Sequence, residues 1–556
     1  MILTQTFAPD PTAVGGSIVF SALIAFIPLL LFFVLLGAFK VPTHWCSIIS
    51  LIAALLVAVF GFRMPATLAG LSALQGMAFG LFPILYIVIM AVWLYNLTES
   101  SGRAADVQAI FSAVGRGDKR VQALLLGYAF CGLLEGLAGF GAPVAIACAM
   151  LIALDVPPIR AALAVMVGNA LNVGFGAMAI PVTTVARLGG NVPADAVGAT
   201  MGRIAPLLIF FVPFFVLAII DGARGLKQVW PVALAAGAGM SVGHVVTSNF
   251  ISYELTAVLA SLLSLAAVIA VLRVWQPTTP DDQASAPAKE KVPGGRAVLG
   301  LLPYLLVVVI LSAAKLIKVP TENGSAEILA RFDTSFGWPG LHGNLLDAQG
   351  NVATSTIFNL NWASSPGTML LLTGLIVSAV YGLNSSGGRF EYSFGRGIAT
   401  LGSTISSLKV TILTIAMIMG LAYVMNFSGQ TLAIGQALAA TGAAFAFLSP
   451  FLGWIGTAVT GSATSTAALF GNLQATAATN AGIDPHLLLS VNEVGGGIGK
   501  IVSPQNLAIA AGAIKTPGSE PELLRKGAVW SGILVVSLAV ITVLASSGFL
   551  SFLVVS

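Results

Sequence analysis

"NEVGGGIGKIVSP", residues 492–504, places a glutamate, a lysine and four glycines between two apolar runs. "NALNVGFGAMAIP", residues 169–181, repeats its pattern N-x4-G-x-G-x4-P without a gap. The matched pairs are Asn169 with Asn492, Gly174 with Gly497, Gly176 with Gly499, and Pro181 with Pro504. Glycine and proline at corresponding positions predict one interrupted helix in each half of the chain. Because backbone in hydrocarbon must stay hydrogen-bonded, such a break survives only within protein or beside a cavity.

The composition around these stretches is that of a membrane protein. Of 556 residues, 57% are hydrophobic and only 8% are charged, whereas soluble proteins carry about 25% charged residues. Runs long enough to cross a bilayer recur along the chain, so we expect an all-α polytopic protein with roughly 12–14 transmembrane helices. The net charge of +4 is scattered over loops, which argues against a nucleic-acid partner. Three cysteines in apolar surroundings indicate no disulfide framework.

Polar segments divide the chain into two membrane halves, residues 1–275 and 297–556. The linker between them, 276–296, is rich in proline, alanine and charge and is expected in the cytoplasm, as is the basic loop 98–120. The polar loop 319–366 has few basic residues and is expected outside, where its His342 is interpreted as a surface residue. The absence of Lys or Arg before Lys40 predicts a retained first span with the amino terminus outward.

A second pair of segments strengthens the internal repeat. "EGLAGFGAPVA" (135–145) and "TAVTGSATSTA" (457–467) precede the two broken helices, with Gly139 30 residues before Asn169 and Gly461 31 before Asn492. Two halves that each combine a re-entrant hairpin with a glycine-broken helix are typical of transporters. The alternative is chance similarity in a chain with 61 glycines. Broken helix ends carry free N–H groups and a positive dipole, so the breaks favour an anion site.

Three charged residues fall inside these segments. Glu135 has no charged neighbour between Arg120 and Asp155, and its apolar surroundings disfavour the ionised form, which suits proton exchange. Its alternative role is structural, protonated or paired with an asparagine. Glu493 is a second such acid, or else a charge that reaches water. Lys500 is expected to pair with Glu493 or with a substrate carboxylate.

The other charged residues and the histidines are interpreted as having no catalytic or ligand-binding role. Near predicted span ends, solvated or snorkelling side chains are expected at Asp155, Arg160, Arg187, Arg203, Asp221 and Arg224. The four histidines are far apart, and the chain has no P-loop and no G-x-S-x-G motif. These absences argue against an enzyme, a metal site and a nucleotide-driven pump. Two kinds of transport protein remain: a secondary carrier that works by alternating access, and a channel. The two dissimilar halves favour the carrier.

Several blocks resemble the L-lactate permease family: "LLEGLAGFGAPVAI" (133–146), "VGFGAMAIPV" (173–182), "LSPFLGWIGTAVTGSATSTAALF" (448–470) and "GKIVSPQNLAIA" (499–510). The resemblance covers the chain from first span to last. It implies symport of L-lactate, and often glycolate, with a proton across the bacterial inner (plasma) membrane, without a cofactor. The implied substrate-binding residues are Gly139, Phe140, Gly141, Ala142, Asn169, Gly461, Ser462, Asn492, Lys500, Ser503 and Gln505. The proton-coupling residues are Glu135 and Glu493.

The sequence also departs from the family pattern. The family often has an Asp and an Asn where this chain has Ala463 and Ala467, and a small polar residue is usual in place of Glu493. If the missing Asp carries the coupling ion, Glu135 or Glu493 takes that role here, or substrate and ion differ. A sodium-coupled carrier of another small organic anion and an anion channel are therefore the rival hypotheses. Analogy with elevator-like carriers is compatible with a homodimer.

Overall fold

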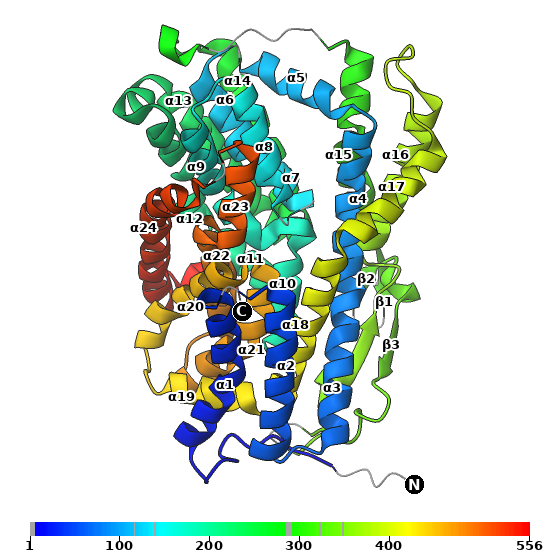
Figure 1. Cartoon of the computed structure of the whole chain (residues 1–556), viewed down its shortest axis with the longest axis vertical. Helices are drawn as coiled ribbons and strands as arrows, with labels where there is room; N and C mark the ends of the chain where they lie inside the picture. The colour runs from blue at the N-terminus through cyan, green and yellow to red at the C-terminus, as the bar shows by residue number, and fades with distance from the viewer. Residues whose placement is uncertain are drawn as a thin grey trace.

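The computed structural model describes residues 6–39, 41–115, 117–137, 139, 141–284, 292–321, 324–346, 350–516 and 518–555. Phe140, one of the expected substrate-binding residues, lies outside them, as do Lys40 and residues 285–291 of the central linker. In the described part of the chain, eleven helical segments are long and apolar enough to cross a membrane. The protein is therefore an all-α polytopic membrane protein, as predicted (Figure 1).

The amino-terminal half is built almost entirely of helices. Its elements are α1 (Ile18–Gly37), α2 (Thr43–Leu56), α3 (Ala66–Phe79), η2 (Gly80–Leu85), α4 (Tyr86–Ser100), α5 (Ala104–Val114), α6 (Lys119–Gln122), η3 (Ala123–Phe130), α7 (Cys131–Leu137), α8 (Ala142–Ala153), α9 (Pro158–Asn169), η4 (Ala170–Phe175), α10 (Gly176–Leu188), α11 (Ala194–Ile204), α12 (Pro206–Ile209), α13 (Val212–Phe250) and α14 (Thr256–Val274). The segment from α11 through α13 is 57 residues long and contains a non-helical residue, Gly222 (φ 61°, ψ −145°). Its length accommodates two membrane crossings.

The carboxy-terminal half adds two short hairpins and a series of short helices. Its elements are α15 (Gly294–Leu316), β1 (Lys318–Thr321), β2 (Gly324–Glu327), β3 (Thr334–Gly337), β4 (Ile357–Leu360), α16 (Pro366–Leu383), α17 (Phe394–Ser407), α18 (Lys409–Phe427), α19 (Gln430–Ala439), α20 (Ala444–Thr460), α21 (Ala463–Ala481), α22 (Pro485–Gly499), η9 (Lys500–Val502), α23 (Pro504–Ala513) and α24 (Glu520–Ser546). The strands pair antiparallel, β1 with β2 and β3 with β4. The apolar runs near Thr431, Phe451 and Leu487 thus form helices of 10, 17 and 15 residues.

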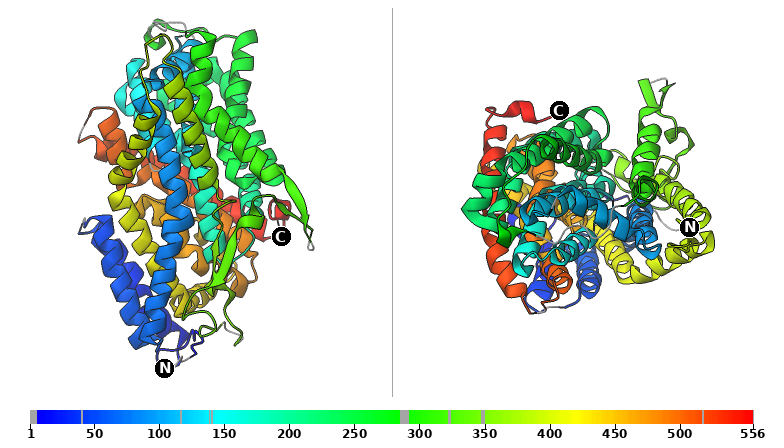
Figure 2. Two further views of the ribbon diagram at one scale, coloured as in Figure 1. Left: turned by 90° about the vertical axis from the view of Figure 1, so that its right-hand side faces the viewer. Right: turned by 90° about the horizontal axis from the view of Figure 1, so that it is seen from above.

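The polar segments gather at two opposite ends of the molecule. α5 and α6 lie at one end, and the amino terminus and the β3–β4 hairpin lie toward the other (Figures 1 and 2). Isolated bridges join Asp118 to Ala284 at the first end and Phe7 to Leu345 at the second. The segments expected on the same side of the membrane therefore do lie together. Which end faces the cytoplasm stays a prediction.

A buried charge cluster stabilises the end that carries α6. The guanidinium of Arg120, which is fully buried, forms ion pairs with Asp118 (2.7 Å) and Asp221 (3.2 Å). It also donates a hydrogen bond to the carbonyl oxygen of Thr278 in the linker (2.9 Å). The Asp221 side chain is only 5% exposed, so the expectation that it is a solvated charge is wrong. Asp221 also pairs with Arg224 three residues later (2.6 Å), but its buried counter-ion, Arg120, lies 101 residues away in the sequence, where no local pattern indicates it.

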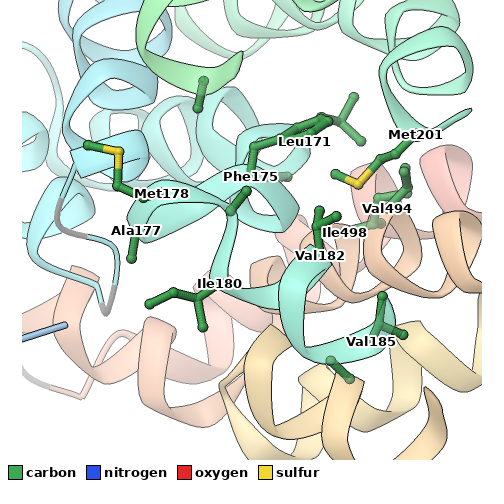
Figure 3. Packing of buried hydrophobic residues seen from close by; sticks show 14 of the residues in the cluster. Leu171, Phe175, Ala177, Met178, Ile180, Val182, Val185, Met201, Val494 and Ile498 are labelled. Carbon is green, nitrogen blue, oxygen red and sulfur yellow. The ribbon is translucent and has the colours of Figure 1, made fainter. Parts of the chain in front are cut away.

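The two broken helices pack directly against each other at the centre of the molecule. A Cβ atom at Gly497 would lie 2.3 Å from the carbonyl oxygen of Ala170, so only glycine permits this approach. Leu171 and Phe175 on one side and Val494 and Ile498 on the other fill the surrounding space (Figure 3). Glycine was expected to bring backbone close to a ligand. At Gly497 it brings helix close to helix instead.

Candidate functional site

A cavity of about 1050 Å³ brings the segments of the repeat together. Its wall is formed by the turn between α7 and α8, the turn between α20 and α21, and the breaks before α10 and α23, with α1, α2 and α18 completing it. Six of the residues expected to act in transport line it: Glu135, Gly139, Gly461, Ser462, Lys500 and Gln505. Segments that are more than 300 residues apart in the sequence thus share one site.

The first break is longer than the sequence pattern indicates. After α9 the chain forms the 3-10 helix η4, and Gly176 is extended (φ −66°, ψ 153°). Ala177, Met178 and Ala179 then adopt left-handed conformations, with φ of 45°, 57° and 56°. L-residues adopt this conformation at a cost of about 1–2 kcal/mol each, so the surrounding packing must hold it. Gly176 and Ala177 line the cavity.

The second break is compact and is closed by a helix cap. α22 ends at Gly499, η9 follows, and Ser503 is extended (φ −72°, ψ 135°) before Pro504 begins α23. The Ser503 hydroxyl accepts a hydrogen bond from the backbone N–H of Asn506 (3.3 Å) and donates one to the carbonyl oxygen of Lys500 (3.1 Å). Serine before proline is a favoured helix start. This cap places the amino end of α23 at the cavity wall.

Both hairpin turns use glycines with positive φ and contact α23. Gly139 (φ 60°) and Gly141 (φ 85°) form the first turn, and Gly461 (φ 74°) forms the second. A Cβ at Gly141 would lie 2.4 Å from Ile509 Cδ1, and one at Gly461 would lie 2.3 Å from Gln505 Oε1. The Ile509 and Gln505 side chains could move aside, so it is the positive φ at these positions that favours glycine. Whether the two hairpins enter and leave the membrane on the same side stays a prediction.

The charged groups of the cavity form a buried pair. Lys500 Nζ lies 2.9 Å from Glu135 Oε1, and Asn169 Nδ2 donates a hydrogen bond to Glu135 Oε2 (2.7 Å). Glu135 is 2% exposed and Lys500 is 7% exposed. Glu135 is thus not isolated: its counter-ion comes from the second break, 365 residues later. Among the described residues that line the cavity, Glu135 is the one acid and Lys500 the one lysine.

Glu493, the second expected proton-coupling residue, lies behind the cavity wall. It is 1% exposed, so the alternative that it reaches water is wrong. Its Oε1 accepts a hydrogen bond from Asn492 Nδ2 (2.9 Å), and Asn492 Oδ1 accepts one from Gln474 (3.3 Å). Gln474 in turn accepts a hydrogen bond from the Ser449 hydroxyl (2.7 Å). Lys500 pairs with Glu135 instead of with Glu493.

The remaining expected residues support the wall from behind. Asn169 and Ser503 are buried and make the contacts described above. Gly141 and Ala142 begin α8, and Asn492 belongs to the polar group around Glu493. Sequence reasoning missed Gln474 and Ser449, although polar residues in apolar helices are a usable signal. It also missed the contribution of α1, α2 and α18 to the cavity.

Metal binding finds no support in the described ranges. No group of three or more His, Cys, Asp or Glu side chains that could hold a metal ion occurs among these residues. The groups that line the cavity are one ammonium group, one carboxyl group, the imidazole of His44, hydroxyls, amides and helix ends.

Comparison with known proteins identifies relatives that are named as permeases. The glycolate permease GlcA of Escherichia coli (strain K12) is 35% identical over 573 residues, covering 99% of each chain. The L-lactate permease of Bacillus subtilis (strain 168) is 34% identical, covering 97% of this chain and 98% of its own. Among solved structures, the YdaH transporter of Alcanivorax borkumensis gives a TM-score of 0.34 at 17% identity over 80% of this chain and 88% of its own, which carries no argument about the fold.

The family model for L-lactate permease matches residues 21–548 of this chain. The apolar helices and the bacterial relatives together make it a multi-pass protein of the bacterial inner (plasma) membrane. On the length of this match and the identity of its relatives, the chain belongs to the L-lactate permease family.

Proposed function

We propose that this protein is a secondary active transporter that carries L-lactate and related 2-hydroxy monocarboxylates, among them D-lactate and glycolate, into the cell with a proton. The names of the relatives, glycolate permease and L-lactate permease, support the substrate class. The observation that carries the proposal is the pair of Lys500 and Glu135 in the cavity wall. The ammonium group can form an ion pair with the carboxylate of a monocarboxylate, and the carboxyl group beside it can accept a proton.

The charges of this pair explain why substrate and proton would travel together. With Glu135 ionised, the empty site is neutral. A substrate carboxylate added alone would leave a net negative charge in the buried site, and a proton added alone to Glu135 would leave Lys500 unpaired. Both states are costly, since a buried charge without a partner is destabilised by several kcal/mol. With both added, the substrate carboxylate replaces Glu135 as the partner of Lys500, and the site is neutral again.

Asn169 suits both states of Glu135. Its amide nitrogen donates a hydrogen bond to Glu135 Oε2 while that carboxylate is ionised. Its amide oxygen, Oδ1, is buried and makes no hydrogen bond among the described residues. A rotation of the Asn169 amide would let Oδ1 accept a hydrogen bond from protonated Oε2. The residue therefore positions Glu135 in the empty carrier and in the loaded carrier.

The opposite wall offers partners for the rest of a 2-hydroxy acid. Thr460, Ser462 and Gln505 line the cavity beside Gly461, and hydroxyl and amide groups can hydrogen-bond a substrate hydroxyl. The amino ends of α21 and α23 also meet the cavity, with Ala463 and Pro504 in its wall. Their dipoles add partial positive charge toward an anion. Ala463 leaves this wall without the acid that the family often carries there.

Transport by purified protein in proteoliposomes tests the proposal. Labelled L-lactate should accumulate against its gradient when the outer solution is made more acidic than the vesicle interior. Excess unlabelled glycolate should reduce this uptake by competing for the site. A sodium gradient without a pH gradient should drive no accumulation. Accumulation driven by sodium alone would favour the sodium-coupled carrier. Downhill flux that neither gradient can drive uphill would favour an anion channel.

A further inference from the structure

A second cavity of about 340 Å³ lies at the far end of α10 from the first. The first turns of α10 reach the main cavity through Gly176, Ala177 and Pro181. Its last turns reach the second cavity through Thr183 and Arg187. The opposite wall of the second cavity comes from β3, β4 and the residues beside them. We call this cavity the outer pocket, because the loop 319–366 that forms its wall is expected outside the membrane.

The guanidinium of Arg187 in the outer pocket is held by neutral groups. Its Nη1 donates a hydrogen bond to Asn191 Oδ1 and its Nη2 donates one to the carbonyl oxygen of Ile357, both at 2.6 Å. Within the part of the chain that the structure describes, no carboxylate pairs with it. These two contacts and a side-chain hydrogen bond with Tyr423 fix the planar group. A bound carboxylate would supply the missing counter-ion. Arg187 lies in the last turn of α10, near a span end as the sequence indicates, and it also lines the outer pocket.

The facing wall carries groups that suit a hydroxyl. Asp333 lines the pocket, and its Oδ1 accepts hydrogen bonds from the backbone N–H groups of Ala363 (3.0 Å) and Ser364 (3.1 Å), which fix its position. The side chains of Asn359 and Asn361 also line the pocket. Carboxylate and amide oxygens accept a hydrogen bond from a ligand hydroxyl. The negative charge of Asp333 would at the same time disfavour a ligand with a second carboxylate.

We propose that the outer pocket is a second binding site for a small hydroxy monocarboxylate, with Arg187 as the partner of its carboxylate. Its volume is at the lower end of the range of small-ligand sites, which is about 300–1000 Å³. The ligand class rests on the proposed function, while the site itself rests on the pocket and its charges. Because α10 borders both cavities, a ligand in the outer pocket would lie against the same helix that borders the transport site.

Equilibrium binding of labelled L-lactate to the purified full-length protein tests this site. The intact protein should bind two molecules per chain. Arg187→Gln should weaken one of these sites by roughly thirtyfold or more, the usual effect of truncating a hydrogen-bonded charge pair, and should leave the other unchanged. Lys500→Met should remove the other site and spare the Arg187-dependent one.

Arg203→Gln is the matched control. Arg203 makes the same kinds of contact as Arg187, donating hydrogen bonds to Asn249 Oδ1 (2.8 Å) and to the carbonyl oxygen of Phe552 (2.9 Å), but it lines neither cavity. It should leave both sites intact. Asn361→Leu alters the pocket without touching the bonds of Arg187, and it should weaken the same site if Arg187→Gln fails to fold.

The failures of the two proposals are distinguishable. One lactate bound per chain, with an affinity that neither Arg187→Gln nor Asn361→Leu changes, would overturn the outer pocket and leave the proposed function standing. An intact protein that binds no lactate would overturn both.

Discussion

Replacing Lys500 by methionine removes the one lysine from the described wall of the cavity and keeps most of the side chain's length. The ammonium lies 2.9 Å from Glu135 and both groups are more than 90% buried. At that distance, and with an effective dielectric constant near 20, the attraction between two unit charges is about 6 kcal/mol. Loss of one partner from a buried pair costs about 3–5 kcal/mol in practice. We therefore expect lactate affinity to fall roughly a hundredfold to a few thousandfold.

Binding of lactate to the purified variant is the assay, and two further variants complete it. Lys409→Met removes an exposed lysine at the start of α18, next to the cavity wall, and should leave affinity unchanged. The double variant Lys500→Met with Glu135→Gln removes the stranded carboxylate, so thermal stability should recover while lactate affinity stays low. Restored affinity in the double variant, or unchanged affinity in Lys500→Met, would make the lysine a scaffold residue and refute its role as the substrate's partner.

Three other substitutions test the proton-coupling residue, the contact between the two broken helices and the buried charge cluster. Glu135→Gln should abolish lactate accumulation driven by a pH gradient while exchange of internal for external lactate persists; normal accumulation would remove Glu135 from the coupling. Gly497→Ala places a Cβ 2.3 Å from the carbonyl oxygen of Ala170 and should cost about 1–3 kcal/mol of stability, visible as a lower melting temperature; an unchanged one would contradict the tight helix contact. Arg120→Gln leaves the buried carboxylate of Asp118 without its ion-pair partner and should lower stability by about 3–5 kcal/mol with lactate affinity kept; weakened binding would connect this distant cluster to the site.

The two helix interruptions could be predicted because they depend on local sequence. Helix interruptions follow from glycine and proline at fixed spacing, and the structure interrupts both helices where the motifs lie. Even so, the two breaks differ in length, since three left-handed residues extend the first. Ala177 occupies the position in the first motif that Lys500 occupies in the second. The two matched motifs therefore both contribute to the cavity wall, and only the second contributes an ammonium group.

The partner of each charge could not be predicted. Sequence reasoning selected Glu135, Glu493 and Lys500, because charged residues inside apolar segments are rare and costly. It expected Lys500 to pair with Glu493 or with a substrate carboxylate, whereas the fold pairs it with Glu135 from the other half of the chain. Asn169 and Asn492, matched in the motif, both donate a hydrogen bond to a glutamate. Asn169 contacts Glu135 in the first hairpin, whereas Asn492 contacts the adjacent residue Glu493. This difference depends on tertiary packing and cannot be inferred from the motif.

In the proposed transport cycle, the lactate carboxylate replaces Glu135 as the ion-pair partner of Lys500, and Glu135 is protonated at the same time. Calorimetric titration of the purified protein with L-lactate, repeated at one pH in buffers with different ionisation heats, measures the protons taken up on binding. We expect uptake of about one proton per lactate bound at the transport site in the intact protein, and about none in Glu135→Gln. Binding without proton uptake in the intact protein, or the same uptake in Glu135→Gln, would contradict it.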